Sequence, residues 1–209
     1  LFFFMSYGLD ALAHTAETLT GHAFGARDRA TLRRAAGYTL GWSVVVAAAL
    51  SVGYALAGGF LIDLMTTLPD VRATAREYLP WLAAAPLAAV GAFHLDGVFI
   101  GTTRTIELRN SMFGAFLCYL AALWLALDAL GNHGIWLAMT VFMVARTVLL
   151  GLRYPALERL AAACRAIRTC RSSAGESRCA WPPSFSPRSP HSRCRAAPAA
   201  TPAAAPSWT

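Results

Sequence analysis

The chain has 209 residues, of which 56% are hydrophobic and 14% are charged, and its mean hydropathy is +0.47. Soluble domains carry about 25% charged residues, so the composition argues against an ordinary soluble enzyme. The apolar content also excludes disorder of the whole chain. A net charge of +7 would favour a nucleic-acid partner only if it were spread over the fold.

The charge divides the chain into two unlike pieces. Residues 1–162 contain eleven Arg and ten acidic residues, whereas residues 163–209 contain seven Arg and one acid, Glu176. The second piece also holds seven of the eleven prolines and four of the five cysteines. We therefore expect a nearly neutral body at 1–162, a disordered Arg/Pro/Ala-rich tail at 163–209, and no nucleic-acid partner. We prefer the interpretation that this tail is an out-of-frame reading of an Ala/Arg/Pro-biased gene.

The body has the pattern of an all-α, polytopic membrane helix bundle. A helix needs about 20 mostly apolar residues to cross about 30 Å of hydrocarbon. Apolar stretches of this length recur along the body, and the short connections leave no room for a soluble domain. The five expected spans are residues 1–25, 35–62, 77–101, 110–127 and 134–152, of which the first is the least apolar.

Arginine placement predicts the orientation of these spans. With five spans, the arginine-rich connections after the first and third spans lie on the same side as the segment after the last span. The positive-inside rule puts this side, and therefore the C-terminus, in the cytoplasm. The first span then starts outside. Because the chain also opens with Leu1 rather than Met, we expect it to be the C-terminal part of a longer protein.

Ionisable side chains inside the first expected span are candidate functional residues, because each costs roughly 2.5 kcal/mol or more at the bilayer centre. Ser6, Asp10, His14, Glu17 and Gly21 recur at steps of three and four and share one helix face. This stripe predicts a helix that lines a polar path, with Glu17 deeper than Asp10. Acids near the outer interface or in a packed hydrogen-bond network are the alternative.

The third expected span contains His94 and Asp96, which are about 200° apart around a helix and point to opposite faces. We favour Asp96 for a central cavity, on the same face as Thr103. His94 is interpreted as a histidine whose hydrogen bonds are satisfied between helices. Arg146 in the last span is expected to reach the interface or to pair with an acid.

Glycine spacing indicates close helix packing. The motifs Gly21–Gly25, Gly37–Gly41 and Gly97–Gly101 all have the form GxxxG, which lets helix backbones approach closely. Pro80 and Pro86 predict a bend in the third span. The sequence contains no phosphate-binding loop, paired-cysteine zinc spacing or nucleophile motif, so no enzyme activity, metal or organic cofactor is expected.

Three segments resemble the DinF-like branch of the MATE (multidrug and toxic compound extrusion) transporters. Ala16–Asp28 is similar to the end of the eighth helix of that family, with His22 where Gln is usual. Leu95–Met112 is similar to the tenth helix and the following loop, and Gly131–Arg153 to the twelfth helix. The segments occur in the family's order and at its spacing.

The resemblance implies the C-terminal lobe of a twelve-helix antiporter in a bacterial inner membrane. Such proteins export organic, often cationic, compounds in exchange for protons or sodium by alternating access. The implied partners are the lipid bilayer, a small organic substrate and the missing N-terminal lobe. The candidate substrate and ion pathway residues are Glu17, Asp96, Asp10, His14 and Thr103. A flippase for lipid-linked precursors and a non-transporting fragment are the alternatives.

Overall fold

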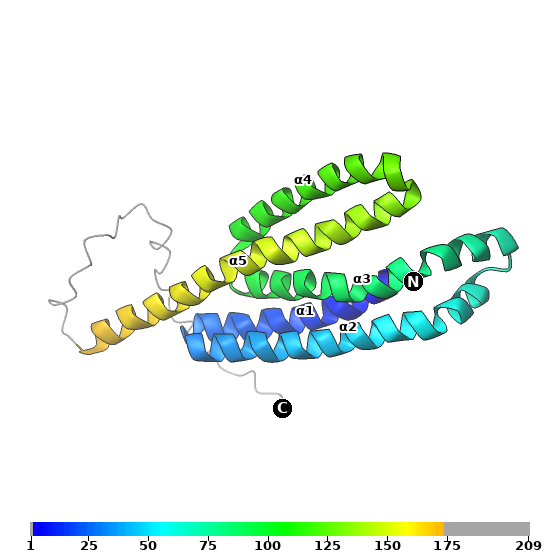
Figure 1. Ribbon diagram of the computed structural model, residues 1–209. Helices are drawn as coiled ribbons and strands as arrows, with labels where there is room; N and C mark the ends of the chain where they lie inside the picture. The colour runs from blue at the N-terminus through cyan, green and yellow to red at the C-terminus, as the bar shows by residue number, and fades with distance from the viewer. Residues whose placement is uncertain (1, 174–209) are drawn as a thin grey trace, which may run out of the picture. The chain divides into compact units, whose positions relative to one another are not determined.

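The computed structural model describes residues 2–173, which form five α-helices joined by short connections (Figure 1). The helices are α1 (Phe2–Gly25), α2 (Arg29–Met65), α3 (Pro69–Gly101), α4 (Thr105–Leu130) and α5 (Asn132–Ser173). No strand occurs in this part of the chain. The predicted all-α class and the five helices are therefore confirmed.

The chain divides into the units Leu1–Ala162 and Ala163–Thr209, and the packing described below belongs to the first unit. Helix α5 continues to Ser173, so regular structure extends past the predicted end of the body at residue 162. The rest of the predicted disordered tail, residues 174–209, lies outside the described residues.

Every helix after α1 is longer than the apolar run that predicted it. Helix α2 begins six residues earlier than expected and α3 eight residues earlier, so the connections shrink to residues 26–28, 66–68 and 102–104 and to Gly131. A helix satisfies its own backbone hydrogen bonds. Charged residues beyond an apolar run can therefore extend the helix and still keep their side chains in water.

The helix ends carry recognisable local signals. Asp28 caps α2: its Oδ1 accepts a hydrogen bond from the Ala30 N–H at 3.1 Å, and its Oδ2 accepts one from the Thr31 hydroxyl at 2.8 Å. Pro69 occupies the first turn of α3, where its missing N–H leaves no helical bond unmade. Gly131 turns the chain between α4 and α5 with a φ of +55°.

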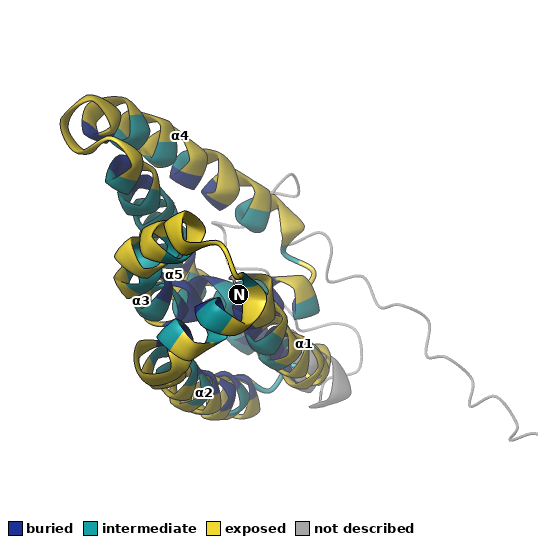
Figure 2. Cartoon of the chain, turned by 90° about the vertical axis from the view of Figure 1, so that its right-hand side faces the viewer, coloured by how far each residue is buried: buried dark blue, intermediate teal, exposed yellow. Residues whose placement is uncertain are grey.

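Four helices are long and apolar enough to cross a membrane, namely α2, α3, α4 and the Asn132–Ala162 part of α5. Helix α1 is not among them, because its stripe of Asp10, His14 and Glu17 lowers its hydropathy. The chain is thus a multi-pass membrane protein, and the fifth span remains a prediction. Exposed apolar side chains such as Trp42 and Trp124 cover the outer faces of the helices, as expected where lipid replaces water (Figure 2).

Helices α1, α2 and α3 lie side by side and enclose the main core (Figure 1). One cluster joins Leu9 of α1 to Tyr54 of α2 and Val90 of α3. A second cluster, formed by Ala16, Ala36, Val98 and Leu157, brings α5 against the same three helices. Many of the buried residues are alanines, consistent with close packing between membrane helices. Val98 of this second cluster lies two residues from Asp96 and four from His94 along α3, and these two polar residues are described next.

Candidate functional site

A buried ion pair joins α3 to α5. The Arg146 guanidinium donates a hydrogen bond to Oδ2 of Asp96, and their side chains are only 13% and 15% exposed. Oδ1 of Asp96 and Nε of Arg146 have no hydrogen-bond partner among the described residues. Arg146 thus pairs with an acid, one of its two expected fates. The carboxylate expected to face a central cavity is engaged by a neighbouring helix.

His94 leaves α3 in another direction and is 3% exposed. Its side chain lines a cavity between α2, α3 and α5, and its Nδ1 has no hydrogen-bond partner within the described part of the chain. The sequence analysis predicted that the ring nitrogens of His94 are hydrogen-bonded between helices, and Nδ1 differs from this expectation. The reason is local: Gly91 and Thr147, which also line this cavity, supply a close approach but no hydrogen bond to the ring.

Thr103 does not share a helix face with Asp96. Helix α3 ends at Gly101, and Thr103 lies in the following connection with a φ of +58°. Its hydroxyl donates to the carbonyl of Thr102 at 2.7 Å. The expectation that Asp96 and Thr103 share one helix face was wrong, because a spacing of seven residues places two side chains on one face only where the helix continues between them.

The polar stripe of α1 runs along the edge of the face that packs into the bundle: Asp10 and His14 are exposed, Glu17 is half-buried and Gly21 touches α3. His14 Nδ1 is 3.2 Å from Oε2 of Glu17, and its Nε2 is 3.8 Å from Oδ2 of Asp10. The three side chains are 71%, 35% and 54% exposed in that order. Alanines and leucines about 100° further round α1, such as Leu9 and Ala16, pack into the bundle. The stripe is therefore an accessible row of alternating acid, imidazole and acid.

Glycines position α1 against α3. A Cβ built on Gly97 would overlap the carbonyl oxygen of Ala13, and one on Gly101 would overlap that of Glu17. A Cβ on Gly21 would lie 2.9 Å from the carbonyl oxygen of Gly101. The backbones of the two helices therefore touch at these residues, immediately beside the stripe.

The other glycines of the predicted packing motifs behave differently. Gly25, Gly37 and Gly41 have no described atom within 4 Å of an added Cβ. The Gly37–Gly41 motif therefore brings no two described helices together, and in the Gly21–Gly25 motif only Gly21 makes a helix contact. A spacing of four places two glycines on one face, but only a partner helix turns that face into a contact.

One further polar cluster was not predicted from the sequence. Glu158 of α5 is 10% exposed, and the Arg29 guanidinium of α2 donates to its Oε2 at 2.9 Å. Tyr154, one turn earlier, lies beside the same carboxylate. A signal was present, because Thr147, Gly151, Tyr154 and Glu158 recur at steps of four and three, as in the α1 stripe.

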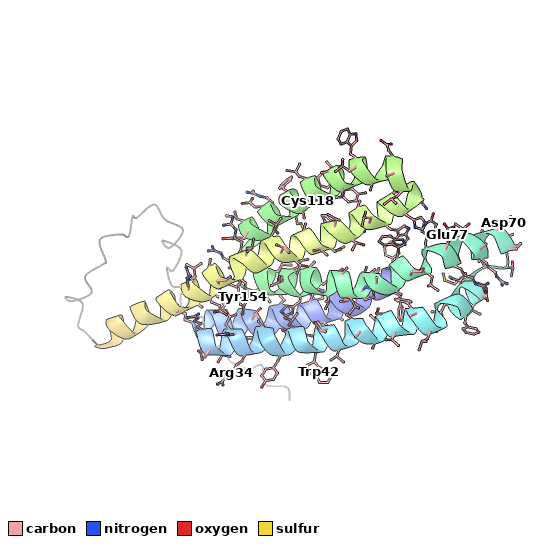
Figure 3. All side chains as sticks on the ribbon, in the orientation of Figure 1. Arg34, Trp42, Asp70, Glu77, Cys118 and Tyr154 are labelled. Atoms are coloured by element: carbon pink, nitrogen blue, oxygen red, sulfur yellow. The ribbon has the colours of Figure 1, made fainter. Side chains whose placement is uncertain are left out.

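The two ends of the bundle differ in composition. Arg34 and Tyr154 lie at the end where α1 finishes and α2 begins, and Asp70 and Glu77 lie at the opposite end (Figure 3). At the second end, the Trp81 indole N–H donates to Nδ1 of His133 at 3.1 Å, and Nε2 of this histidine is 3.2 Å from Glu77. These contacts tie α3 to the start of α5.

The fold and its buried charges define a polytopic α-helical membrane protein with ionisable groups between its helices. The MatE family model matches residues 1–127, and the chain belongs to this family. The DNA damage-inducible protein F of Escherichia coli (strain K12) is 42% identical over 143 residues, which are 68% of this chain and 31% of that protein. The chain thus matches about a third of that relative's length. No solved structure matches it.

Proposed function

We propose that the chain is the C-terminal lobe of a secondary-active efflux antiporter. It would export organic, often cationic, compounds in exchange for protons or sodium by alternating access. Membership in the MatE family carries the proposal. The match to about a third of a longer relative supports the assignment as one lobe.

The α1 stripe is the proposed ion and substrate path. A helix that packs into a bundle and carries exposed acids beside its packed face cannot present those acids to lipid without a large cost. A polar cleft, shared with an N-terminal lobe, would accommodate them. Glu17 and Asp10 would attract a cationic substrate or a coupling ion, and His14 lies between them.

Asp96 receives a different role from the one expected on its sequence position alone. One of its carboxylate oxygens already accepts from Arg146, and the pair is nearly neutral as a unit. We therefore place Asp96 as a positioning residue that holds α3 to α5, and Glu17 as the preferred pathway acid.

The proposed location is a bacterial inner membrane with the arginine-rich end of the bundle in the cytoplasm. The connection between α1 and α2 carries Arg27 and continues into Arg29, Arg33 and Arg34 of α2. The positive-inside rule places this end inside. The C-terminus would then also be cytoplasmic.

Transport in proteoliposomes tests the function. The chain would be reconstituted alone and as a fusion behind the N-terminal half of the E. coli relative, and ethidium movement would be driven by a proton gradient or a sodium gradient. We expect transport only by the fusion, a loss of at least tenfold in Glu17→Gln, and little change in the control Asp70→Asn at the opposite end. Transport by the chain alone would contradict its role as one lobe. A fusion that is folded but inactive under both gradients would contradict antiport.

A further inference from the structure

A cavity of about 630 Å³ opens between α2, α3 and α5, away from the α1 stripe. Its lining includes Arg33, Gly37 and Leu40 of α2 and Gly151 of α5, all of which are exposed. The cavity therefore opens on the outer surface of the bundle, between α2 and α5. Exposed apolar side chains flank the opening, among them Tyr38 at 75% exposure. Such a surface faces lipid in a membrane protein.

One end of the cavity is positively charged. Glu158 lines it, but its carboxylate is already engaged by Arg29 and Tyr154. Arg33 also lines it and has no salt bridge to a carboxylate within the described residues. The charge left for a ligand at this end is therefore that of the Arg33 guanidinium, which suits a phosphate.

The rest of the cavity is a mostly apolar groove that runs along the helices. Glu158 and Thr147, both in the lining, are eleven residues apart on α5, which corresponds to about 16 Å along the helix. Ala36, Leu40 and Leu95 form apolar walls along this length. A cavity with a charged end and a long apolar part suits an amphiphile, because a small soluble anion would leave the apolar part unfilled.

His94 and Thr147 are the polar residues of the lining away from the charged end, and the Thr147 hydroxyl already donates to the Met143 carbonyl. Ala36 and Val98 share a core cluster and lie at about the same level. Arg33 is three residues from that level toward one end, and His94 is four residues toward the other, so His94 lies about 10 Å deeper than Arg33. Its imidazole is buried, and Nδ1 lacks a partner in the described part of the chain. An ester group about 10 Å below a phosphate would lie at the level of this ring.

We propose that this cavity is a binding site for one anionic phospholipid. The phosphate pairs with Arg33, an acyl chain occupies the channel between α2 and α5, and the ester region lies at the level of His94. The site is distinct from the proposed transport path on α1, so the lipid acts on α2–α3–α5 packing and is not the exported compound. Basic pockets between membrane helices are established sites for anionic headgroups in general.

The chain offers matched pairs of variants for a test. Arg33→Gln removes the charge at the mouth, and its control Arg34→Gln removes the neighbouring charge, which does not line the cavity. Gly37→Leu fills the channel, and its control Gly41→Leu adds the same side chain one turn away, outside the lining. No described atom lies within 4 Å of a Cβ at either glycine, so both variants are expected to fold.

The measurement is native mass spectrometry of the purified full chain released from nanodiscs of phosphatidylglycerol or of phosphatidylcholine. We expect one tightly retained phosphatidylglycerol, at least fivefold more than phosphatidylcholine. Retention should fall at least fivefold in Arg33→Gln and Gly37→Leu and stay within twofold in both controls. Millimolar inorganic phosphate should not displace the lipid.

Three results would overturn the proposal. Equal retention of the two lipids would show that the site does not distinguish an anionic headgroup from a zwitterionic one. An equal loss in Arg34→Gln would show a general surface charge effect with no site. Displacement by inorganic phosphate would identify a free-anion site instead. Circular dichroism and gel filtration of each variant verify that a lost lipid does not reflect a lost fold.

Discussion

The ion pair between Asp96 and Arg146 should dominate the response of this bundle to single charge deletions. The change to test is Arg146→Gln, which leaves the Asp96 carboxylate between α3 and α5 with no opposite charge. At 15% exposure this carboxylate cannot turn to water without moving a helix. The expected result is a clear loss of stability that a second substitution repairs.

The magnitude follows from burial. Removing one partner of a buried pair costs about 3–5 kcal/mol, because the desolvation penalty of the remaining charge is no longer offset. For a chain of this size, each kcal/mol lowers Tm by about 2–4 °C, so Arg146→Gln should lower it by at least about 6 °C. The double variant Asp96→Asn with Arg146→Gln removes both charges. It leaves two amides that can bond each other, so it should recover most of the loss.

The assay is thermal unfolding of the purified chain in detergent, followed by gel filtration of the heated samples. Asp63→Asn is the control, since Asp63 pairs with Arg72 and Arg76 while 36% exposed. An exposed pair is worth about 0–1 kcal/mol, so the control should stay within about 4 °C of the parent. A Tm for Arg146→Gln as high as that of the control would refute the reasoning, as would a double variant less stable than both single variants.

Three other predictions concern the helix contacts and the membrane crossing of α4. Gly97→Leu should destabilise the chain by at least about 1–3 kcal/mol, because the new side chain meets the Ala13 backbone. The control Gly53→Leu lies in open space and should not destabilise it, and unfolding in detergent compares the two variants. Arg29→Gln should lower the free energy of unfolding by about 1–3 kcal/mol, because it leaves the buried Glu158 carboxylate without its cation. Glu158→Gln should lower it less, because Arg29 is half exposed and can turn to water. Equal losses of stability in the same assay would contradict this asymmetry. In a cysteine-free background, Thr103→Cys and Asp128→Cys should react with an impermeant maleimide from opposite sides of the membrane, since α4 separates them; labelling of both in intact cells would reject a membrane-crossing α4.

The fold could be predicted from the sequence because lipid imposes a simple rule. A segment such as residues 35–62 has no charge to place in hydrocarbon, and a helix is the structure that satisfies its backbone there. The same rule fails at helix ends. Residues 29–34 are charged and were expected to form a loop, yet they belong to α2, because Asp28 caps the helix at that point. Hydropathy therefore predicts which part of a helix lies in lipid, but it does not predict where the backbone hydrogen bonds of that helix begin and end.

The candidate site was predictable only in part, because one-dimensional spacing fixes faces and not partners. The α1 stripe was found, since its five residues lie on one helix. The partner of Asp96 required knowledge that α5 runs along α3, which brings Arg146, fifty residues later, into contact. Thr103 shows the opposite failure: a seven-residue spacing placed it on the face of Asp96, but Gly101 ends the helix between them. Tertiary pairing and helix termination are the two facts that the spacing lacked.

The α1 helix brings these arguments together. Its glycine contacts with α3 are among the closest backbone approaches in the described chain, and yet the stripe beside this contact carries Asp10, His14 and Glu17. Tight packing on one side fixes the orientation of the helix, so Asp10 and His14 stay exposed. In a membrane, charge held outward in this way requires a polar environment on that side. The contact at Gly97 and Gly101 therefore orients the proposed path, and we expect that loosening this contact impairs the proposed transport even where every acid is retained.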